Sequence, residues 1–485
     1  MSLHCAIRAA NLNRCRVESG GRFLWGHELD IWKAAVGSKY TEWFNKFGPV
    51  YRVKGALFHP DIVSASFQFK APPARPIIGR LVGEGIIWAE GEQHKRFRRL
   101  MDSIFSAAST KRMTPDVLNV CSRLQTRLSQ YLQDNGGDAV INMKPWTSAA
   151  TLDIIGFVGF GYDFRLGESP EAKAIISAWA EQVKLGLGES AFFAEMVLRA
   201  FPRLLSIPLP ALEAQGKIRR IIAELASRIM EDARAGGDVS QGYNFLDAMM
   251  KATGEGRMTT QETIDNNRSL AAYETTAGTL DFMLYELAKN PACQQKLRDE
   301  LHAFGGEPTY DDFERPDRLC YLDAVVKEGL RMYPAAVHNA RVTNEEDVMP
   351  LEKPVRLPSG EVISEIHVPA GQIVYTPHLS IQRMEGIWKD GDSFKPERWV
   401  EPGGLPPREQ LPTGWSNLLT FNAGPRLCLG YRLGKCFILF SLISNFVFHD
   451  TAAKIDLRVV TVLQPIVAGE DEKGAQMPLR VTYAR

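Results

Sequence analysis

Apolar residues recur with a helical period through most of residues 91–341. The clearest segment starts at Thr259, with Glu262 three positions later in the spacing of a capping box, and it ends at Asn290 before a proline. The pattern predicts a single helix of roughly thirty residues, well above the mean helix length. We expect a helix of this length to lie buried along the middle of the molecule.

Other kinds of segment flank this helical region. An amphipathic helix is predicted around residues 32–47, and the short run at residues 50–55 has the composition of a strand. Between residues 350 and 376 the sequence changes to Pro/Gly turns and alternating strands, and helical periodicity returns after Gly430. The predicted fold class is therefore mainly α with a smaller β portion.

Composition and charge narrow the classes of protein that remain. The 485 residues are 45% hydrophobic, and Lys+Arg and Asp+Glu number 57 each, so the balance indicates no nucleic-acid partner. The longest apolar stretch, residues 436–448, falls short of the about 20 residues that span a bilayer. The seven cysteines form no CxxC pair and no zinc-type spacing, which indicates reduced, intracellular thiols: Cys5, Cys15, Cys121, Cys293, Cys320, Cys428 and Cys436.

The first residues carry three arginines before the first acid, Glu18. A weak transit-like segment, a remnant of a lost anchor and a disordered end are all compatible with this pattern. We expect residues 1–28 to be a flexible N-terminal segment without a transmembrane anchor.

Residues 421–430, FNAGPRLCLG, enclose Cys428 between two glycines, a proline and an arginine, directly before a helical run. One interpretation is a small core side chain, the usual place of a free cysteine. The other is a thiolate ligand to a metal or haem, which needs an unusual backbone around it. Further clusters of residues decide between the two.

Two such clusters lie upstream of Cys428. Glu328 and Arg331 are three residues apart and can pair on one helical face, and Arg398 in FKPERW could complete a buried network with them. Glu274 and Thr275, in AAYETT, are poor choices for the middle of a long helix. For a single threonine the alternative is a hydroxyl bonded back to its own helix.

Together these residues resemble the cytochrome P450 superfamily of haem-thiolate monooxygenases, in its eukaryotic, fungal-like form. The haem-loop pattern Phe-x-x-Gly-x-Arg-x-Cys-x-Gly is matched in full, and GEQHKRFRR, AAYETT, Glu-x-x-Arg and PERW precede it in family order. The resemblance covers nearly everything from residue 45 onward. It implies the P450 fold, one large domain at residues 29–485 with haem between the long central helix and the cysteine loop.

The resemblance implies a role for each residue of the cysteine loop. Cys428 would be the axial thiolate ligand of a heme b iron, whose electron donation favours O–O cleavage. Gly424 and Gly430 would let the backbone approach the sulfur and supply amide donors, and Phe421 would shield the thiolate from water. The residues implied for binding the haem propionates are His94, Arg98, Arg341 and Arg426.

Roles are implied for the upstream clusters as well. Glu328, Arg331 and Arg398 would form a structural network that holds the proximal loop. Glu274 and Thr275 would be the catalytic residues of the distal side, where the hydroxyl holds a water and the acid feeds protons from solvent. Two positions depart from the commonest pattern: Ala272 stands where a glycine is usual, and His94 where many members have tryptophan.

Electrons are expected from a separate protein, because no glycine-rich dinucleotide fingerprint follows Cys428. NADPH would be used indirectly, through an NADPH–cytochrome P450 reductase, with a b-type cytochrome as a further possible donor, and the chain is expected to be a monomer. A basic docking patch for the reductase is predicted from residues that resemblance places on the proximal side: Lys95, Arg96, Arg99, Arg432 and Lys435.

The implied reaction inserts one atom of molecular oxygen into an apolar organic substrate, as in secondary metabolism. An apolar cavity is predicted from Ile86, Ile87, Phe192, Phe193, Ala336 and Val337, which does not identify the substrate. A haem-thiolate isomerase or dehydratase and a non-catalytic haem-binding protein stay open, although neither needs the Glu274–Thr275 pair. We expect peripheral association with the endoplasmic reticulum surface through residues 201–212, with the cytosol as the alternative.

Overall fold

The computed structural model describes residues 27–47, 51–53, 62–64, 79–80, 83–201, 203–204, 210–234, 244–270, 273–315, 317–357, 359–432 and 437–484. Helices make up most of this part of the chain, and the strands are concentrated at its beginning and toward its end. The mainly α class with a smaller β portion is confirmed.

The α-helices bury apolar residues in one main core and in smaller separate clusters. In chain order they are α2 (Glu28–Lys33), α3 (Ser38–Phe47), α5 (Gly91–Asp102), α6 (Ala107–Asp134), α7 (Lys144–Ile155), α8 (Pro170–Gly186), α9 (Glu189–Ala200), α10 (Pro210–Arg234), α11 (Phe245–Gly254), α12 (Thr260–Leu270), α13 (Tyr273–Lys289), α14 (Pro291–Phe304), α15 (Tyr310–Glu314), α16 (Cys320–Met332), α17 (His378–Arg383) and α18 (Phe437–Asn445).

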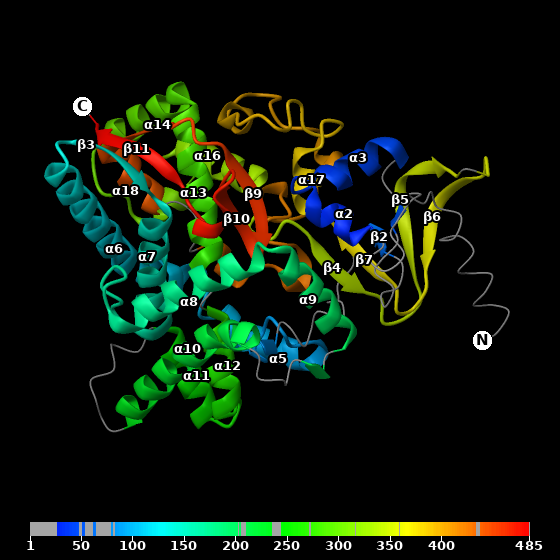
Figure 1. Ribbon diagram of the computed structural model, residues 1–485, viewed down its shortest axis with the longest axis horizontal. Coiled ribbons are helices and arrows are strands. Elements are labelled where there is room, and N and C mark those ends of the chain that lie inside the picture. Colours follow the sequence, from blue (N-terminus) through cyan, green and yellow to red (C-terminus); the bar gives the residue numbers. More distant parts are fainter. Residues whose placement is uncertain are drawn as a thin grey trace.

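Helix α13 runs through the middle of the molecule, with α6 and α7 on one side of it and the sheet edge formed by β5 and β6 far out on the other (Figure 1). It packs against α7, α16 and two C-terminal strands. Most of its side chains are buried, Glu274 and Asp281 among them. In the structure, the region of the predicted long helix contains α12 and α13. Ala272, between them, lies outside the described residues. The predicted capping box is present, because Thr259 and Glu262 exchange bonds of 2.9 and 3.1 Å.

The strands form four small sheets. One sheet has the order β1-β2-β7-β4, β3, β11 and β8 form a second in the order β3-β11-β8, and β5-β6 and β9-β10 are antiparallel pairs. The strands are β1 (Arg52–Val53), β2 (Ile62–Ser64), β3 (Asp138–Asn142), β4 (Asn339–Val342), β5 (Asp347–Arg356), β6 (Val362–Val368), β7 (Ile373–Thr376), β8 (Phe446–His449), β9 (Ile455–Val460), β10 (Val462–Val467) and β11 (Pro478–Tyr483).

Two predictions about secondary structure were wrong in part. The helix expected over residues 32–47 is interrupted between α2 and α3, where Gly37 adopts φ +82°, a conformation that other residues rarely adopt. After Gly430, the described part of the chain has one α-helix, α18, with 3₁₀ turns at Leu429–Arg432 and Asp471–Lys473, and strands β8 to β11. Their apolar residues alternate over runs of six residues or fewer, so a helical period there was a misreading of short strands.

Candidate active site

Cys428 lies in a loop built by short 3₁₀ turns. The first, Gly424–Arg426, begins at Gly424, which has φ +64°. The second, Leu429–Arg432, follows the cysteine. The Cys428 N–H donates to the carbonyl of Phe421 at 2.8 Å, which closes the loop around the side chain. The Phe421 ring packs edge-on against Trp415, with ring centroids 5.3 Å apart. The glycine, the phenylalanine and the cysteine of the sequence motif are thus brought together in one turn.

The surroundings of the Cys428 thiol are suited to a metal ligand. The side chain is reachable by solvent, yet burial among protein atoms raises the pKa of its thiol. A hydrogen bond from the Gly430 N–H and the positive charge of Arg98 act in the opposite direction and favour the thiolate. Gly430, the second glycine of the motif, therefore contacts the sulfur directly.

Three arginines from three parts of the chain gather beside this loop. Arg98, on α5, donates to the carbonyl of Leu427 and pairs with Asp102 at 2.7 Å. Arg341, on β4, is 8% exposed, and burial together with the like charge of Arg426 lowers the pKa of its guanidinium. His94 lies buried on α5. The four residues predicted for propionate binding therefore come from elements that meet at the cysteine loop.

A carboxylate that the sequence did not single out lies among these arginines. Glu90, the residue before α5, forms an ion pair with Arg426. The charge of Glu90 also raises the pKa of Arg341, against the larger effects of burial and Arg426. Its other oxygen, Oε1, is buried and accepts no hydrogen bond from the described residues.

The donor set fits the haem that the resemblance implies. A soft thiol with one amide donor is available for iron, and three guanidinium groups outnumber the nearby carboxylates of Glu90 and Asp102. The surplus of one positive charge would offset part of the charge of the two propionates, because a buried carboxylate is stable only when it is paired. Cys428 would hold the iron, and Arg98, Arg341 and Arg426 would hold the propionates.

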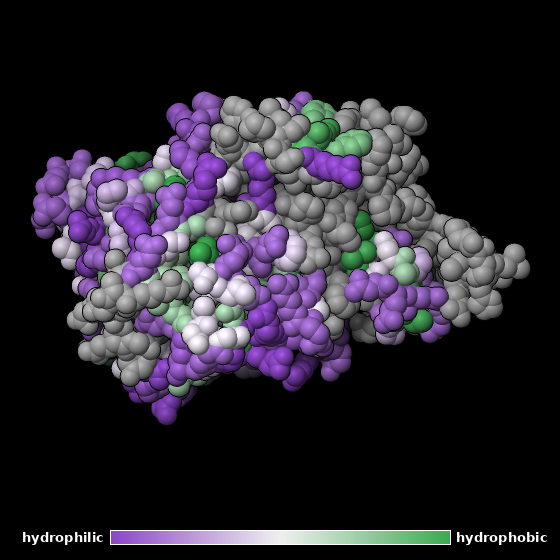
Figure 2. Space-filling model, turned by 90° about the horizontal axis from the view of Figure 1, so that it is seen from below, coloured by the Kyte–Doolittle hydropathy of each residue, from purple (hydrophilic) through white to green (hydrophobic). Residues whose placement is uncertain are grey.

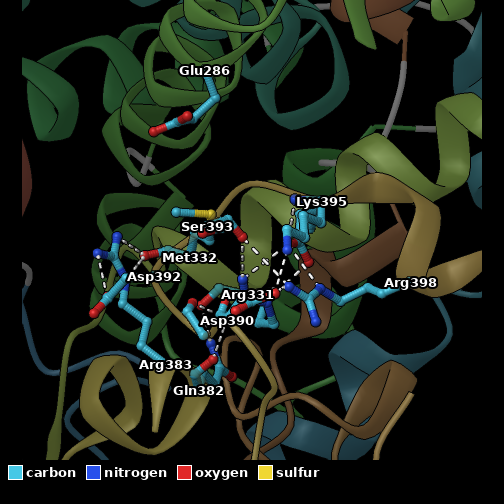
Figure 3. Close-up of polar contacts among 12 residues, drawn as sticks. Glu286, Arg331, Met332, Gln382, Arg383, Asp390, Asp392, Ser393, Lys395 and Arg398 are labelled. Carbon is cyan, nitrogen blue, oxygen red and sulfur yellow. Dashed lines mark hydrogen bonds and ion pairs between the residues drawn. The ribbon is translucent and has the colours of Figure 1, made fainter. Parts of the chain in front are cut away.

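The predicted Glu328–Arg331–Arg398 cluster is present and fully buried. Arg331 donates two bonds of 2.9 Å to the two carboxylate oxygens of Glu328, and Arg398 donates Nε to Oε1 at 3.0 Å. Burial alone would raise the pKa of Glu328, but the two arginines outweigh it and the pKa lies below the usual value. Figure 3 shows Arg331 and Arg398 converging from different elements, with dashed lines from both to backbone and side-chain acceptors.

Further donors and acceptors complete this network, and the motifs do not contain all of them. Trp399 donates Nε1 to Glu328 Oε2 at 2.9 Å, and the Lys395 N–H donates to Oε1 at 2.9 Å. Arg331 also donates to the carbonyls of Gln382 and Gly391 at 2.6 and 2.7 Å (Figure 3). One carboxylate therefore ties α16 to the PERW turn, and one guanidinium ties it to α17 and the segment that follows.

Gln382 carries the connection onward to the stretch before the cysteine loop. Its amide donates to the Arg331 carbonyl at 2.9 Å, and its Oε1 accepts the N–H of Leu419 at 2.6 Å. Thr420 donates to the Leu330 carbonyl at 2.7 Å. Sequence reasoning missed Gln382, since a lone glutamine on a short helix carries no motif.

On α13, the two predicted catalytic residues have different surroundings. Glu274 is 2% exposed and is held from α7: Lys144 Nζ lies 2.5 Å from its Oε2, and the Ser148 hydroxyl donates to its Oε1 at 2.8 Å. Thr275 is half-buried, and its carbonyl accepts a bond of 2.9 Å from the Thr279 hydroxyl. Glu274 does not itself reach solvent, so any proton from solvent must pass through other groups to arrive there.

The predicted docking patch is wrong at Arg96. Its guanidinium pairs with Glu262 on α12 and donates to the Arg257 carbonyl at 2.8 Å, so its charge is committed within the protein. Lys95 is well exposed and pairs with Glu92 on the same helix. Arg432 lies over the ring of Tyr431. Lys435 lies outside the described residues.

The six residues predicted to line one apolar cavity divide into groups. Phe192 and Phe193 form a small cluster with Leu29 and Trp32, where Phe192 and Trp32 have ring centroids 5.5 Å apart. Ile86 and Val337 belong to the main core instead, whereas Ile87 and Ala336 are exposed. The Ile86 N–H donates to the buried Asn266 side chain of α12 at 2.7 Å, which fixes that loop to the helix.

Comparison with known proteins agrees with this arrangement. Residues 20–465 match the family model described as Cytochrome P450. The chain is 32% identical to the cytochrome P450 monooxygenase claQ of Ampulloclitocybe clavipes over 92% of this chain and 88% of that protein. It is 29% identical to cytochrome P450 monooxygenase 128 of Postia placenta over 95% of this chain and 90% of that protein. The chain therefore belongs to the cytochrome P450 family, whose members are haem-thiolate monooxygenases.

Proposed function

We propose that this P450 oxidises an apolar small molecule with electrons that originate from NADPH and arrive through a separate reductase. The observation that carries the proposal is the Cys428 thiol with its Gly430 amide donor, beside the guanidinium groups of Arg98, Arg341 and Arg426. Held by a thiolate, the haem of this family supplies the O–O cleavage chemistry.

The residues around the cysteine act by holding and shielding it. The Gly430 N–H moderates the charge on the sulfur, and the packed rings of Phe421 and Trp415 keep water from one side of the loop. The network around Glu328 fixes the segment that leads into the loop, because Gln382 and Thr420 connect it to α16. None of these groups needs to touch substrate.

On the opposite side, we propose that Glu274 and Thr275 handle protons. The Thr275 hydroxyl would hold a water, and the Glu274 carboxyl would supply its proton. The hydrogen bonds of Glu274 to Lys144 and Ser148 keep the carboxyl in one position until it is needed. This role is supported by the burial of an acidic residue in the first turn of α13, where burial is costly without a partner.

A reconstituted assay tests the function and the role of Thr275 together. With a P450 reductase, wild-type protein is expected to show substrate-dependent NADPH consumption and an oxygenated product. In Thr275→Ala, NADPH consumption should continue while the product per NADPH falls roughly tenfold or more and hydrogen peroxide rises, because general acid–base groups typically contribute at least that much. Equal product yields in the two proteins would contradict the role of Thr275.

For the reductase, we propose a docking surface smaller than the predicted one, which includes Lys95, Arg99 and Arg432. Lys95 and Arg99 lie on the exposed side of α5, and Arg99 is in its last turn. Surface cations of this kind raise association rates and lose their effect as salt screens them. Arg96 is left out of this surface because its guanidinium bonds Glu262 and the Arg257 carbonyl outside α5, whereas Lys95 pairs with Glu92 on its own exposed helix.

Membrane association is proposed through the segment that includes Phe201, which is 50% exposed. Within the described ranges, no helix combines the length and the apolar character that crossing a bilayer requires. Half of the predicted contact segment, residues 201–212, lies outside the described residues. On the face seen in Figure 2, apolar residues show as separate green areas among hydrophilic ones.

Fractionation of cells that express this chain checks the location. We expect the protein in the endoplasmic reticulum membrane fraction and its release by carbonate, because apolar area buried at the interface holds a protein reversibly. Phe201→Ser should shift part of the protein to the soluble fraction. Recovery of the wild-type protein in the soluble fraction before any wash would favour the cytosol instead.

A further inference from the structure

Three ionisable side chains are enclosed together between α7 and α13. Lys144, Glu274 and Asp281 are 6%, 2% and 0% exposed. The Lys144 ammonium lies 2.5 Å from Glu274 Oε2 and 3.6 Å from Asp281 Oδ2. The two acids are seven residues apart, about two helical turns, and so face the same neighbour. One cation is therefore shared by two carboxyl groups.

Asp281 is the less well satisfied of the two acids. The Thr147 hydroxyl donates to its Oδ1 at 2.6 Å, but Oδ2 accepts no hydrogen bond from any described residue. Leaving a charged oxygen buried in this way is costly, and a proton on it removes the cost. Asp281 therefore has a geometric reason to be a neutral carboxylic acid.

The electrostatics of the cluster agree with the geometry. Burial raises the pKa of Asp281 to about 7, against the opposing effects of Lys144 and Thr147, and the charge of Glu274 adds to the increase. Lys144 and Glu274 are the charged groups that act on Asp281 most strongly. Burial alone would lower the pKa of Lys144, but the two carboxyl groups outweigh it and raise the pKa, so the lysine stays an ammonium.

We propose that Asp281 stores a proton for the distal side of this enzyme and supplies it to Glu274 through the Lys144 ammonium. This inference rests on the proposed function, in which protons are consumed beside Thr275. In the transfer, Lys144 Nζ gives a proton to Glu274 Oε2, and the resulting amine takes the proton from Asp281 Oδ2. One N–H and one O–H bond break and one of each forms, so the net charge of the cluster is unchanged.

Infrared spectroscopy of the resting holoenzyme tests the store without any turnover. We expect a carboxylic-acid C=O band that shifts in D₂O and disappears as the pH rises through about 7. Asp281→Asn should remove this band. The matched control is Asp247→Asn on α11, whose carboxyl also has a buried, unbonded oxygen and a pKa raised by burial but does not take part in this cluster.

The pH dependence of coupling, the amount of product formed per NADPH, tests whether Asp281 supplies protons to Glu274. In the wild type, the fraction of Asp281 that carries a proton falls about tenfold between about pH 6 and 8, and product per NADPH should fall with it. In Asp281→Asn, coupling should be low and flat over this range. Asp247→Asn should follow the wild-type curve.

Two results would overturn the proposal: a titrating acid band that survives in Asp281→Asn, or a pH profile of coupling that this variant shares with the wild type. Failure of the proposed function is distinguishable, because then the wild type forms no oxygenated product at any pH while the infrared band is unaffected. A structural role for Asp281 alone would lower stability and leave the shape of the coupling profile unchanged.

Discussion

Replacing Glu328 with alanine is expected to leave little soluble, haem-loaded protein. The substitution removes the acceptor of Arg331, Arg398 and the Trp399 N–H at once, all of them in a part of the core where Arg331 and Glu328 are 0% exposed. Removing one member of a buried charge pair costs about 3–5 kcal/mol. That is comparable with the whole stability of a typical domain, about 5–15 kcal/mol. The yield of folded protein and its haem content per chain measure the effect.

The matched control is Glu92→Ala on α5. Glu92 also pairs with a cation three residues away, Lys95, but both side chains are well exposed. Exposed pairs contribute about 0–1 kcal/mol, so the yield and haem content should equal those of the wild type. A normal haem content in Glu328→Ala with only a lower turnover would show that the network is not needed to hold the loop.

Replacing Cys428 with serine is expected to abolish the red-shifted Soret band of the reduced, carbon-monoxide-bound protein. That band depends on a thiolate ligand to the iron, and a serine hydroxyl cannot take the place of a soft sulfur donor. Cys428→His is informative where the serine variant loses its haem. The histidine can keep the haem bound while the band moves to the position of a nitrogen-ligated complex.

Cys320→Ser is the control for this experiment. Cys320 is exposed at the start of α16, and burial together with the nearby acids Glu300, Asp317 and Asp323 raises the pKa of its thiol, whereas Cys428 has the cation Arg98 beside it. Its replacement should leave the band unchanged. Loss of the band in Cys320→Ser, with retention in Cys428→Ser, would refute the assignment of the ligand.

Local sequence patterns predicted those parts of the site whose members are close in the chain. Glu328 and Arg331 are one helical turn apart, and residues 421–430 form one loop, so spacing alone describes their geometry. Arg398 was found because its PERW sequence matches a known motif. Trp399 lies in the same sequence, but nothing in the chain indicates that its N–H would bond Glu328.

Contacts between distant segments could not be predicted in the same way. Lys144 is 130 residues from Glu274 and carries no motif, and a lysine normally faces solvent. Arg96 was misassigned for the same reason: its partner Glu262 was recognised only as the acid of a capping box. In both cases the packing of one helix on another decides the partner, and helical periodicity does not specify which helices meet.

The ion pair between Glu90 and Arg426 changes how tightly a cofactor propionate can be held at that point. The guanidinium already has an anionic partner within the chain, so a second carboxylate arrives as a competitor and not as a first neutraliser. The favourable free energy of that contact is then a difference between two similar ion pairs, smaller than the value of either. A propionate on Arg426 would therefore add less to cofactor affinity than one on a guanidinium that has no anionic partner within the chain.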